Sequence, residues 1–280
     1  MQRALGPSGP SPQATRAGNT ASEPERPAAK QQEREAMSGS PSATVVYLLG
    51  IAGHPASSPA LDTLGDAGWD VVVPQIPGFD GRAGFQPPDD YLGWLTVVWD
   101  ALDATGALPC PVVGASVGGM LAADLAVFRP EAVTAAVLLA PFGIFDEAEP
   151  GLDIYALPSA DRMGHLFAKG VPDPFVERFA ELGPDEGPVA RYLSDVAAAS
   201  LVWPLGDRGL ARRIHRIACP TLVLWGELDE LLPVARSGAW AEHALPVEVV
   251  AGAGHLLEWD EPDGVGGRLV GFLADSRGGG

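Results

Sequence analysis

A serine between two glycines marks the point where an apolar run of the sequence meets a helix-like run. Residues 114–118 read G-A-S-V-G, directly after the apolar residues 112–113 and before a run that extends to residue 128. Small neighbours permit the sharp, strained turn that exposes a serine hydroxyl between a strand and a helix. We therefore expect Ser116 to be a nucleophile with the Val117 N–H beside its hydroxyl, the alternative being a turn without chemistry.

An aspartate and a histidine follow two later apolar runs. Asp229 lies in the stretch 226–233, G-E-L-D-E-L-L-P, and His255 lies in the stretch 254–262, G-H-L-L-E-W-D-E-P. A serine hydroxyl is a weak nucleophile near neutral pH, so a histidine must accept its proton during attack and return it to the leaving group. A carboxylate holds that histidine in the correct tautomer. These residue types predict acyl transfer by Ser116, with His255 as the base and Asp229 as the orienting acid.

Short apolar runs alternate with longer amphipathic runs from residue 44 onward. The strand candidates are residues 45–49, 71–73, 112–114, 135–139, 221–225 and 247–250. The helix candidates between them are residues 58–67, 89–104, 117–128, 234–243 and 263–274. Short strands that are apolar throughout are typical of a parallel sheet covered by helices on both faces. Because ligands bind at the carboxyl edge of such a sheet, this α/β fold of about six strands would bring Ser116, Asp229 and His255 together.

The interval 144–217 contains no strand candidate. Its helical patterns are residues 159–169, 174–182, 189–202 and 207–216. We expect a helical lid over the carboxyl edge of the sheet, with the core formed by residues 43–143 and 218–280. The many apolar side chains of the lid predict an apolar substrate pocket. The lid cations that could hold a substrate carboxylate are Arg162, Arg178 and Arg191, although each is expected to be a solvated helix residue.

The motifs at residues 114–118, 226–233 and 254–262 together resemble those of the α/β-hydrolase superfamily, over a stretch from about residue 45 to the end. The resemblance implies the α/β-hydrolase fold and a serine hydrolase with the triad described above. It places the second oxyanion donor after the first strand, and we assign it to the Ile51 N–H, the first being the Val117 N–H. The candidate substrate contacts are Gly50, His54, Phe142 and Trp259.

For the acid of the triad and for two histidines, another interpretation is open. Glu227 and Glu230 flank the assigned acid, and Asp146 stands where some members of the superfamily place theirs. His54 precedes a proline and would otherwise be a solvent-exposed turn residue. His255 would otherwise be a surface loop histidine.

The chain also departs from the superfamily pattern. Leu49 stands where a histidine is common at the oxyanion loop, and Gln75 replaces the usual acid before the P-G-F turn. No strand pattern precedes residue 42, so the two antiparallel strands that usually begin the fold are not expected and all strands should be parallel. The sheet edge left by this loss would be covered by the tail or by a second copy of the chain in a homo-oligomer.

The composition limits the expected partners. Among 280 residues, 36 Asp and Glu stand against 18 Lys and Arg, which gives a net charge of −18. That field repels phosphate backbones and anionic membrane surfaces, so neither nucleic acid nor a membrane is an expected partner. No apolar run reaches the length of a membrane span and no secretory leader is recognisable, so we expect a cytoplasmic protein. Residues 1–42, rich in Pro, Ser, Gly and charge, are typical of a disordered tail.

The sequence therefore predicts a serine hydrolase that acts, through an acyl-enzyme, on a small to medium, largely apolar carboxylic ester or a related acyl compound. Serine at the turn argues against the dehalogenases and epoxide hydrolases of the superfamily, which the resemblance implies would carry aspartate there. The alternatives are a C–C bond hydrolase or a cofactor-free perhydrolase and, in a different class, a ligand-binding protein on the same scaffold. No histidine pair has the spacing of a metal site and no cofactor is implied. Cys110 and Cys219, each before a proline, are expected to be buried free thiols.

Overall fold

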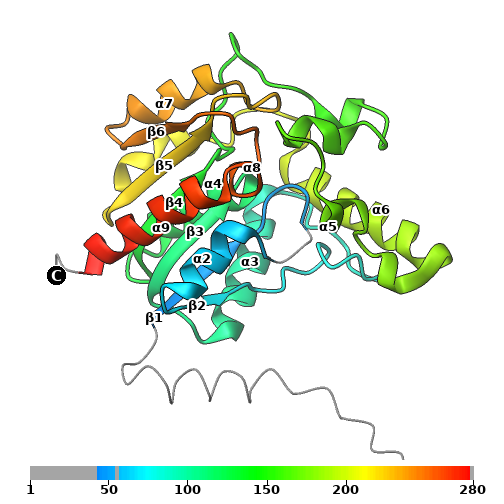
Figure 1. Ribbon diagram of the computed structural model, residues 1–280, viewed down its shortest axis with the longest axis horizontal. Helices are drawn as coiled ribbons and strands as arrows, with labels where there is room; N and C mark the ends of the chain where they lie inside the picture. The colour runs from blue at the N-terminus through cyan, green and yellow to red at the C-terminus, as the bar shows by residue number, and fades with distance from the viewer. Residues whose placement is uncertain (1–42, 54–56, 278–280) are drawn as a thin grey trace, which may run out of the picture. The chain divides into compact units, whose positions relative to one another are not determined.

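The computed structural model describes residues 43–53 and 57–277. Within these residues, a six-stranded sheet forms the centre of the fold (Figure 1). Its strands are β1 (Ala43–Leu48), β2 (Trp69–Val72), β3 (Cys110–Ala115), β4 (Val133–Leu139), β5 (Thr221–Gly226) and β6 (Val247–Val250). Their order is β2-β1-β3-β4-β5-β6, and every neighbouring pair is parallel. The predicted six-stranded parallel sheet is confirmed, whereas the predicted tail, residues 1–42, lies outside the described residues.

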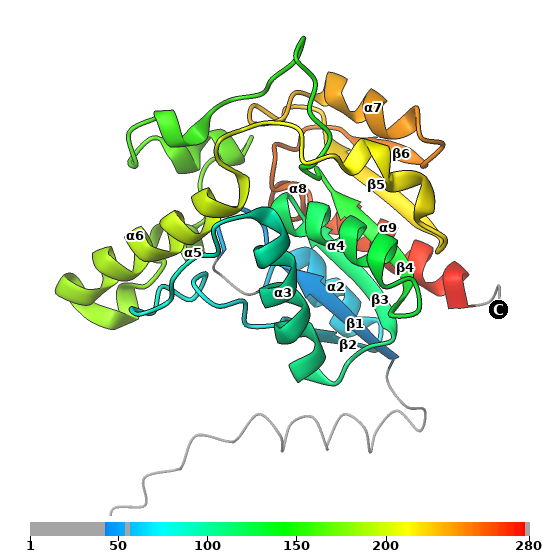
Figure 2. The same cartoon turned by 180° about the vertical axis from the view of Figure 1, so that it is seen from behind.

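Helices cover both faces of the sheet. Those of the core are α2 (Pro59–Asp66), α3 (Tyr91–Thr105), α4 (Val117–Phe128), α7 (Ser237–Ala241), α8 (Leu257–Asp260) and α9 (Pro262–Arg277). Figure 1 shows α2 and α9 in front of the sheet, and Figure 2 shows α3 and α4 on the opposite face. Local residues set the helix ends: the Asp90 side chain accepts the Gly93 N–H at 2.7 Å ahead of α3, and Gly106 ends that helix at φ 68°.

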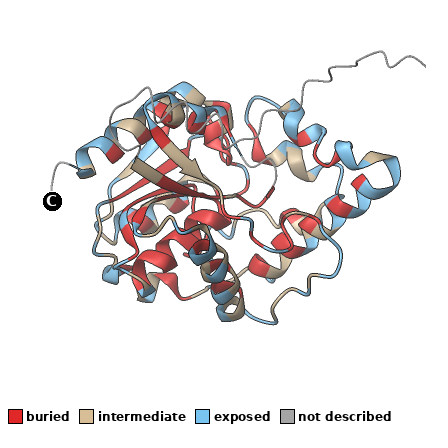
Figure 3. Cartoon of the chain, turned by 90° about the horizontal axis from the view of Figure 1, so that it is seen from below, coloured by how far each residue is buried: buried red, intermediate tan, exposed pale blue. Residues whose placement is uncertain are grey.

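The strands β3 and β4 and the helix α4 form the centre of the core. Every residue of α4 from Val117 to Val127 is buried, as are most residues of the two strands (Figure 3). This helix also buries a charge, because Asp124 accepts hydrogen bonds from Arg213 at 2.5 and 2.7 Å and from Tyr91 at 2.5 Å. A buried carboxylate requires such partners. The cluster therefore ties α3 and the segment before β5 to α4.

The segment 144–217 between β4 and β5, here the lid segment, is less helical than predicted. It contains α5 (Asp173–Val176), α6 (Gly183–Val202) and the 3-10 turns η1 (Ile154–Ala156), η2 (Arg162–Leu166), η3 (Ala180–Leu182), η4 (Leu210–Arg212) and η5 (Ile214–Arg216). The helices predicted at residues 159–169 and 207–216 are wrong, since only 3-10 turns form there. In the second stretch, Asp207 Oδ1 accepts the Gly209 N–H at 2.6 Å, a local bond that competes with helical bonding.

The lid segment lies over the carboxyl edge of the sheet. Three bonds join it to loops that follow β1, β2 and β6: Arg178 donates to Ala52 O, Ser194 Oγ donates to Phe79 O at 3.0 Å, and the Leu256 N–H donates to Leu166 O at 3.0 Å. Each of these loops begins at the carboxyl end of a strand. The placement agrees with a lid, while the exact division into core and lid stays a prediction.

The two thiols differ in burial. Cys110 is buried, but Cys219 is only half-buried in the loop before β5, so the prediction of two buried thiols is wrong for the second. Burial raises the pKa of the Cys110 thiol to about 11, so this side chain is protonated near neutral pH. Across the part of the chain that the structure describes, none of the helices combines the length and apolarity needed to cross a bilayer.

Candidate active site

The backbone at Ser116 is strained in the way that a nucleophile turn requires. Ser116 joins β3 to α4 with φ 58° and ψ −118°, a conformation that residues other than glycine rarely adopt. A Cβ at Gly114 would overlap the Gly118 carbonyl, and a Cβ at Gly118 would overlap the carbonyl of Leu48. The close approach of β1, β3 and α4 therefore requires both glycines.

Ser116, His255 and Asp229 form a continuous chain of hydrogen bonds. His255 Nε2 lies 2.7 Å from Ser116 Oγ, and His255 Nδ1 lies 2.8 Å from Asp229 Oδ2. All three residues are buried, Ser116 and His255 completely. These distances suit a nucleophile, a general base and the acid that orients the base. Among residues 43–53 and 57–277, no group of three or more His, Cys, Asp or Glu is placed to hold a metal ion.

The loop after β5 orients Asp229 toward the histidine. Its Oδ1 accepts the N–H of Leu231 at 2.9 Å and the N–H of Leu232 at 2.8 Å, which leaves Oδ2 for His255. The three alternative acids bond elsewhere: Glu227 accepts the Gly252 N–H, Glu230 contacts His165 and Asp146 accepts the Ala148 N–H. The geometry therefore favours Asp229 as the acid of the triad.

The two N–H groups assigned to the oxyanion hole belong to loops that meet at Ser116. Val117 begins α4, so its N–H is one of the first-turn donors that have no helical acceptor. Ile51 lies in the turn after β1, which the Gly53 N–H closes on Gly50 O at 2.9 Å. Gly50 packs directly on the serine, since a Cβ at this glycine would lie 3.4 Å from Ser116 Cβ. The role of both N–H groups as oxyanion donors stays a prediction.

The other predicted substrate contacts lie in different surroundings. Phe142 adjoins the triad, because its N–H donates to Ser116 O at 3.1 Å and its ring meets the His255 ring edge-on at a centroid distance of 5.8 Å. Trp259 of α8 packs against Phe175 of the lid segment, with ring centroids 4.9 Å apart. His54 lies outside the described residues.

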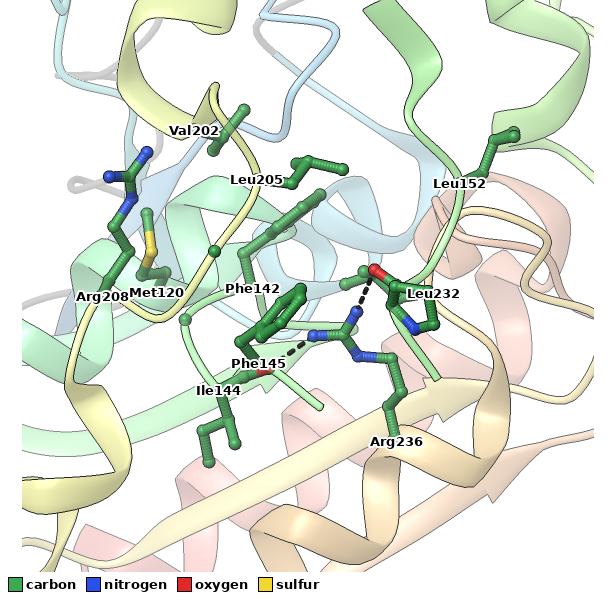
Figure 4. Close-up of a pocket in the computed structure, with 13 residues that line it drawn as sticks. Met120, Phe142, Ile144, Phe145, Leu152, Val202, Leu205, Arg208, Leu232 and Arg236 are labelled. Atoms are coloured by element: carbon green, nitrogen blue, oxygen red, sulfur yellow. Dashed lines mark hydrogen bonds between the residues drawn. The ribbon is translucent and has the colours of Figure 1, made fainter. Parts of the chain in front are cut away.

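Two small cavities adjoin these residues. The inner cavity has about 20 Å³ of free volume, and its walls include Met120, Phe142 and Arg236 (Figure 4). The lid cavity has about 30 Å³ of free volume, and its walls include Ile51 and Arg178. Such a volume holds little more than one or two water molecules. A substrate therefore reaches the buried serine only when contacts of the lid segment are displaced.

Arg178 is buried, so the expectation of a solvated side chain is wrong for this residue. Its guanidinium donates to Ala52 O and lies 2.7 Å from Asp195 Oδ1. These partners compensate the buried charge and bind the lid segment to the loop that carries Ile51. With Arg162 and Arg191, it lines an outer hollow of about 660 Å³ in the lid segment.

Asp260 joins the histidine loop to the lid segment, a function that the sequence analysis missed. Its carboxylate accepts three backbone N–H groups: from Gly254 at 2.8 Å, from Ala168 at 2.9 Å and from Lys169 at 3.2 Å. Gly254 directly precedes His255 in the chain. The only signal in the sequence is an acidic residue within the motif at residues 254–262.

Glu258 is a second acidic residue that the sequence analysis missed. It is 1% exposed, and its Oε1 accepts the Tyr47 hydroxyl of β1 at 3.0 Å. Burial raises the pKa of Glu258 to about 7, and it also raises the pKa of Tyr47 well above its usual range. The negative charge of Glu258 is therefore costly at neutral pH, close to the loop that carries His255.

Comparison with known proteins identifies the family. Residues 45–267 match the model described as the alpha/beta hydrolase family. The chain belongs to this family. One relative is the "2-hydroxy-6-oxo-6-phenylhexa-2,4-dienoate hydrolase" of Comamonas testosteroni, 23% identical over 74% of this chain and 78% of that protein. Another is a pimeloyl-(acyl-carrier protein) methyl ester esterase of Neisseria meningitidis serogroup A, 30% identical over 73% of this chain and 67% of that protein.

Solved structures show the same fold. The 2-hydroxy-6-oxo-6-phenylhexa-2,4-dienoate hydrolase from Rhodococcus sp. strain RHA1 aligns with a TM-score of 0.64 at 21% identity, over 83% of this chain and 91% of that chain. An esterase from Exiguobacterium antarcticum aligns with a TM-score of 0.64 at 18% identity, over 82% and 91%. The resemblance inferred from the three motifs is confirmed: this alpha/beta hydrolase is an enzyme whose relatives are esterases and C–C hydrolases.

Proposed function

We propose that this alpha/beta hydrolase cleaves a small to medium, largely apolar carboxylic ester, in the cytosol, through an acyl-enzyme formed on Ser116. The observation that carries the proposal is the distance of 2.7 Å between Ser116 Oγ and His255 Nε2, on a turn whose backbone is strained. Asp229 supports the assignment, because it holds the other ring nitrogen of His255 at 2.8 Å. Esterases among the relatives favour an ester over other acyl compounds.

The arrangement supplies both halves of an ester hydrolysis. In the first, His255 Nε2 accepts the hydroxyl proton of Ser116 while Oγ attacks the acyl carbon, and the N–H groups of Ile51 and Val117 donate to the carbonyl oxygen as it becomes an oxyanion. The C–O bond breaks, and His255 gives the proton to the departing alkoxide, which leaves as the alcohol. In the second, His255 takes a proton from water, the oxygen attacks the acyl carbon, and the acid departs as Ser116 regains its proton.

A second candidate reaction is the hydrolysis of a C–C bond. It is favoured by two relatives from Comamonas testosteroni, one named as a 2-hydroxy-6-oxo-6-phenylhexa-2,4-dienoate hydrolase and the other as a 2-hydroxy-6-oxononadienedioate/2-hydroxy-6-oxononatrienedioate hydrolase. The same serine and histidine would serve, with a carbanion in place of the alkoxide as the leaving group. Analysis of the products separates the two reactions, because an ester releases an alcohol and a C–C substrate does not. Perhydrolysis, in which hydrogen peroxide replaces water in the second half, is tested by adding peroxide.

Labelling with a fluorophosphonate probe tests the nucleophile. The wild-type protein should be labelled, and Ser116→Ala should not be, whereas Ser57→Ala, which removes an exposed serine, should be labelled like the wild type. Turnover of p-nitrophenyl esters of increasing chain length then measures the size of the acyl group. A wild-type protein that is neither labelled nor active on any of these esters would contradict the proposed function.

A further inference from the structure

Arg236 places a positive charge in the wall of the inner cavity. It ends the 3-10 turn η6 (Val234–Arg236), which follows the loop of Asp229, and it is 6% exposed. Figure 4 shows its guanidinium between the backbone carbonyls that it binds, with Phe145 beside it. Nη1 donates to Pro150 O at 2.8 Å, and Nη2 donates to Ile144 O at 2.5 Å. These two bonds use two of the five N–H groups of a guanidinium.

The charge of Arg236 has no ion-pair partner among the described residues. The carboxylates that act on it belong to Asp146, Asp229 and Glu149, and none of them forms an ion pair with its guanidinium. Burial accordingly lowers the pKa of Arg236. Arg178 differs, because its buried guanidinium has Asp195 at 2.7 Å. A buried charge without a counter-ion is costly, and a bound anion would offset that cost.

The rest of the inner cavity suits the carbon chain of a ligand with an anionic group. Met120, Phe142, Leu152 and Leu205 are among its apolar walls, and its second charged side chain is also an arginine, Arg208. None of the wall residues is acidic, in a chain with twice as many acidic as basic residues. Phe142 contacts both the Ser116 backbone and the His255 ring, so the cavity begins one side chain away from the reacting atoms.

We propose that the inner cavity, widened when the lid segment that forms part of its walls is displaced, binds a carboxylate of the substrate through Arg236, with the apolar walls holding the carbon chain between that carboxylate and the ester. This inference rests on the proposed function, since it concerns the same active site. Charge-assisted bonds from the free N–H groups of Arg236 would hold the carboxylate, and their planar fork favours that shape. The preferred substrates are therefore esters with a carboxylate on either the acyl chain or the leaving group.

Matched pairs of esters test the inference. For the acyl side, the mono-p-nitrophenyl esters of adipic, suberic and sebacic acids are compared with p-nitrophenyl hexanoate, octanoate and decanoate, which lack the terminal carboxylate. For the leaving group, 4-acetoxybenzoate is compared with methyl 4-acetoxybenzoate. In the wild type, kcat/KM should be at least about tenfold higher for the anionic ester in one of these two comparisons, because charge-assisted bonds are among the stronger hydrogen bonds.

Three variants show whether the preference depends on Arg236. Arg236→Met keeps an unbranched stem without the guanidinium charge, and the ratio of kcat/KM between anionic and neutral ester should fall about tenfold. Arg236→Lys keeps the charge and should recover part of the ratio. Arg268→Met removes a more exposed arginine of α9, which pairs with Glu248, and should leave the ratio unchanged. Melting temperatures show whether losing the bonds to two backbone carbonyls unfolds the protein.

The outcomes separate this inference from the proposed function. Equal kcat/KM for anionic and neutral esters in the wild type, or a ratio that Arg236→Met leaves unchanged, would overturn the anion site. Failure of labelling and of all turnover would refute the proposed function instead. Titration of Ser116→Ala with each ester of a pair gives the same comparison as dissociation constants. This keeps the anion site testable if turnover is too slow, and equal constants would overturn it too.

Discussion

Replacing Glu258 by glutamine should make the protein more stable above neutral pH. The Glu258 carboxyl is buried, with the Tyr47 hydroxyl at 3.0 Å from Oε1 and no partner for Oε2 among the described residues. Burial is the largest cause of the rise in its pKa from 4.5 to about 7, which hydrogen bonding to the backbone and to Tyr47 opposes. Glutamine has nearly the same shape and keeps an oxygen for Tyr47, but it cannot ionise.

The size of the effect follows from the two pKa values. Because the pKa of Glu258 is higher in the folded state, the unfolded chain releases this proton at a lower pH than the folded protein does. The free energy of unfolding therefore falls as the pH rises from 4.5 to about 7. Above about 7, the contribution of Glu258 to the free energy of unfolding is at its lowest. Each pKa unit is worth about 1.4 kcal/mol, so the full loss is about 3 kcal/mol. We therefore compare the free energy of unfolding of Glu258→Gln with that of the wild type. The difference, variant minus wild type, should be about 3 kcal/mol larger at about pH 8 than at about pH 4.

Urea unfolding followed by tryptophan fluorescence measures this difference, since the chain contains seven tryptophans. Wild type, Glu258→Gln and Glu242→Gln are compared at several pH values between about 4 and 8. Glu242 is exposed, so its replacement serves as the control for the loss of a surface carboxyl group. If Glu258→Gln differs from the wild type by a constant amount, the carboxyl does not titrate at a raised pKa and the reasoning fails.

Three further predictions concern other parts of the site. Asp229→Asn should lower kcat on a p-nitrophenyl ester about 10⁴-fold, because an amide holds His255 in the wrong tautomer. A loss of kcat under about tenfold would mean that another carboxylate orients the histidine. Asp260→Ala should lower the free energy of unfolding by about 3 kcal/mol and speed hydrogen exchange of the lid N–H groups it binds, whereas unchanged exchange would contradict this anchor. Gly118→Ala should prevent folding, because its Cβ would overlap backbone carbonyls, while Gly271→Ala, which has open space, should keep the wild-type circular dichroism.

The parallel sheet explains why the triad could be predicted from the sequence. Ser116, Asp229 and His255 each follow a short apolar run, and each of these runs forms a strand in the structure. Since the carboxyl ends of parallel strands meet at one edge, the order of the motifs is enough to place the three residues close together. The structure brings them within hydrogen-bond distance, and their catalytic roles stay a prediction.

Contacts between distant segments could not be predicted in this way. Glu258 and Tyr47 are 211 positions apart, and Arg178 and Ala52 are 126 positions apart. Hydrophobic periodicity describes only local neighbours, so it gave no reason to expect a buried arginine or a buried glutamate at these positions. The 3-10 turns of the lid segment replace the predicted helices for another reason. Short polar side chains such as Asp207 bond to the nearby backbone and end a helical pattern early.

The attachments of the lid segment differ in their effect on the catalytic histidine. Asp260 binds backbone N–H groups on both the lid segment and the loop of His255, so displacing the lid at this point would disturb the position of the base. Arg178 binds Ala52 O on the opposite loop, beside the Ile51 N–H assigned to the oxyanion hole. Opening at Arg178 would leave both hydrogen bonds of His255 intact. The two attachments therefore differ in kind: the Arg178 bonds include no residue of the triad, whereas one of the Asp260 bonds is to the residue directly before His255.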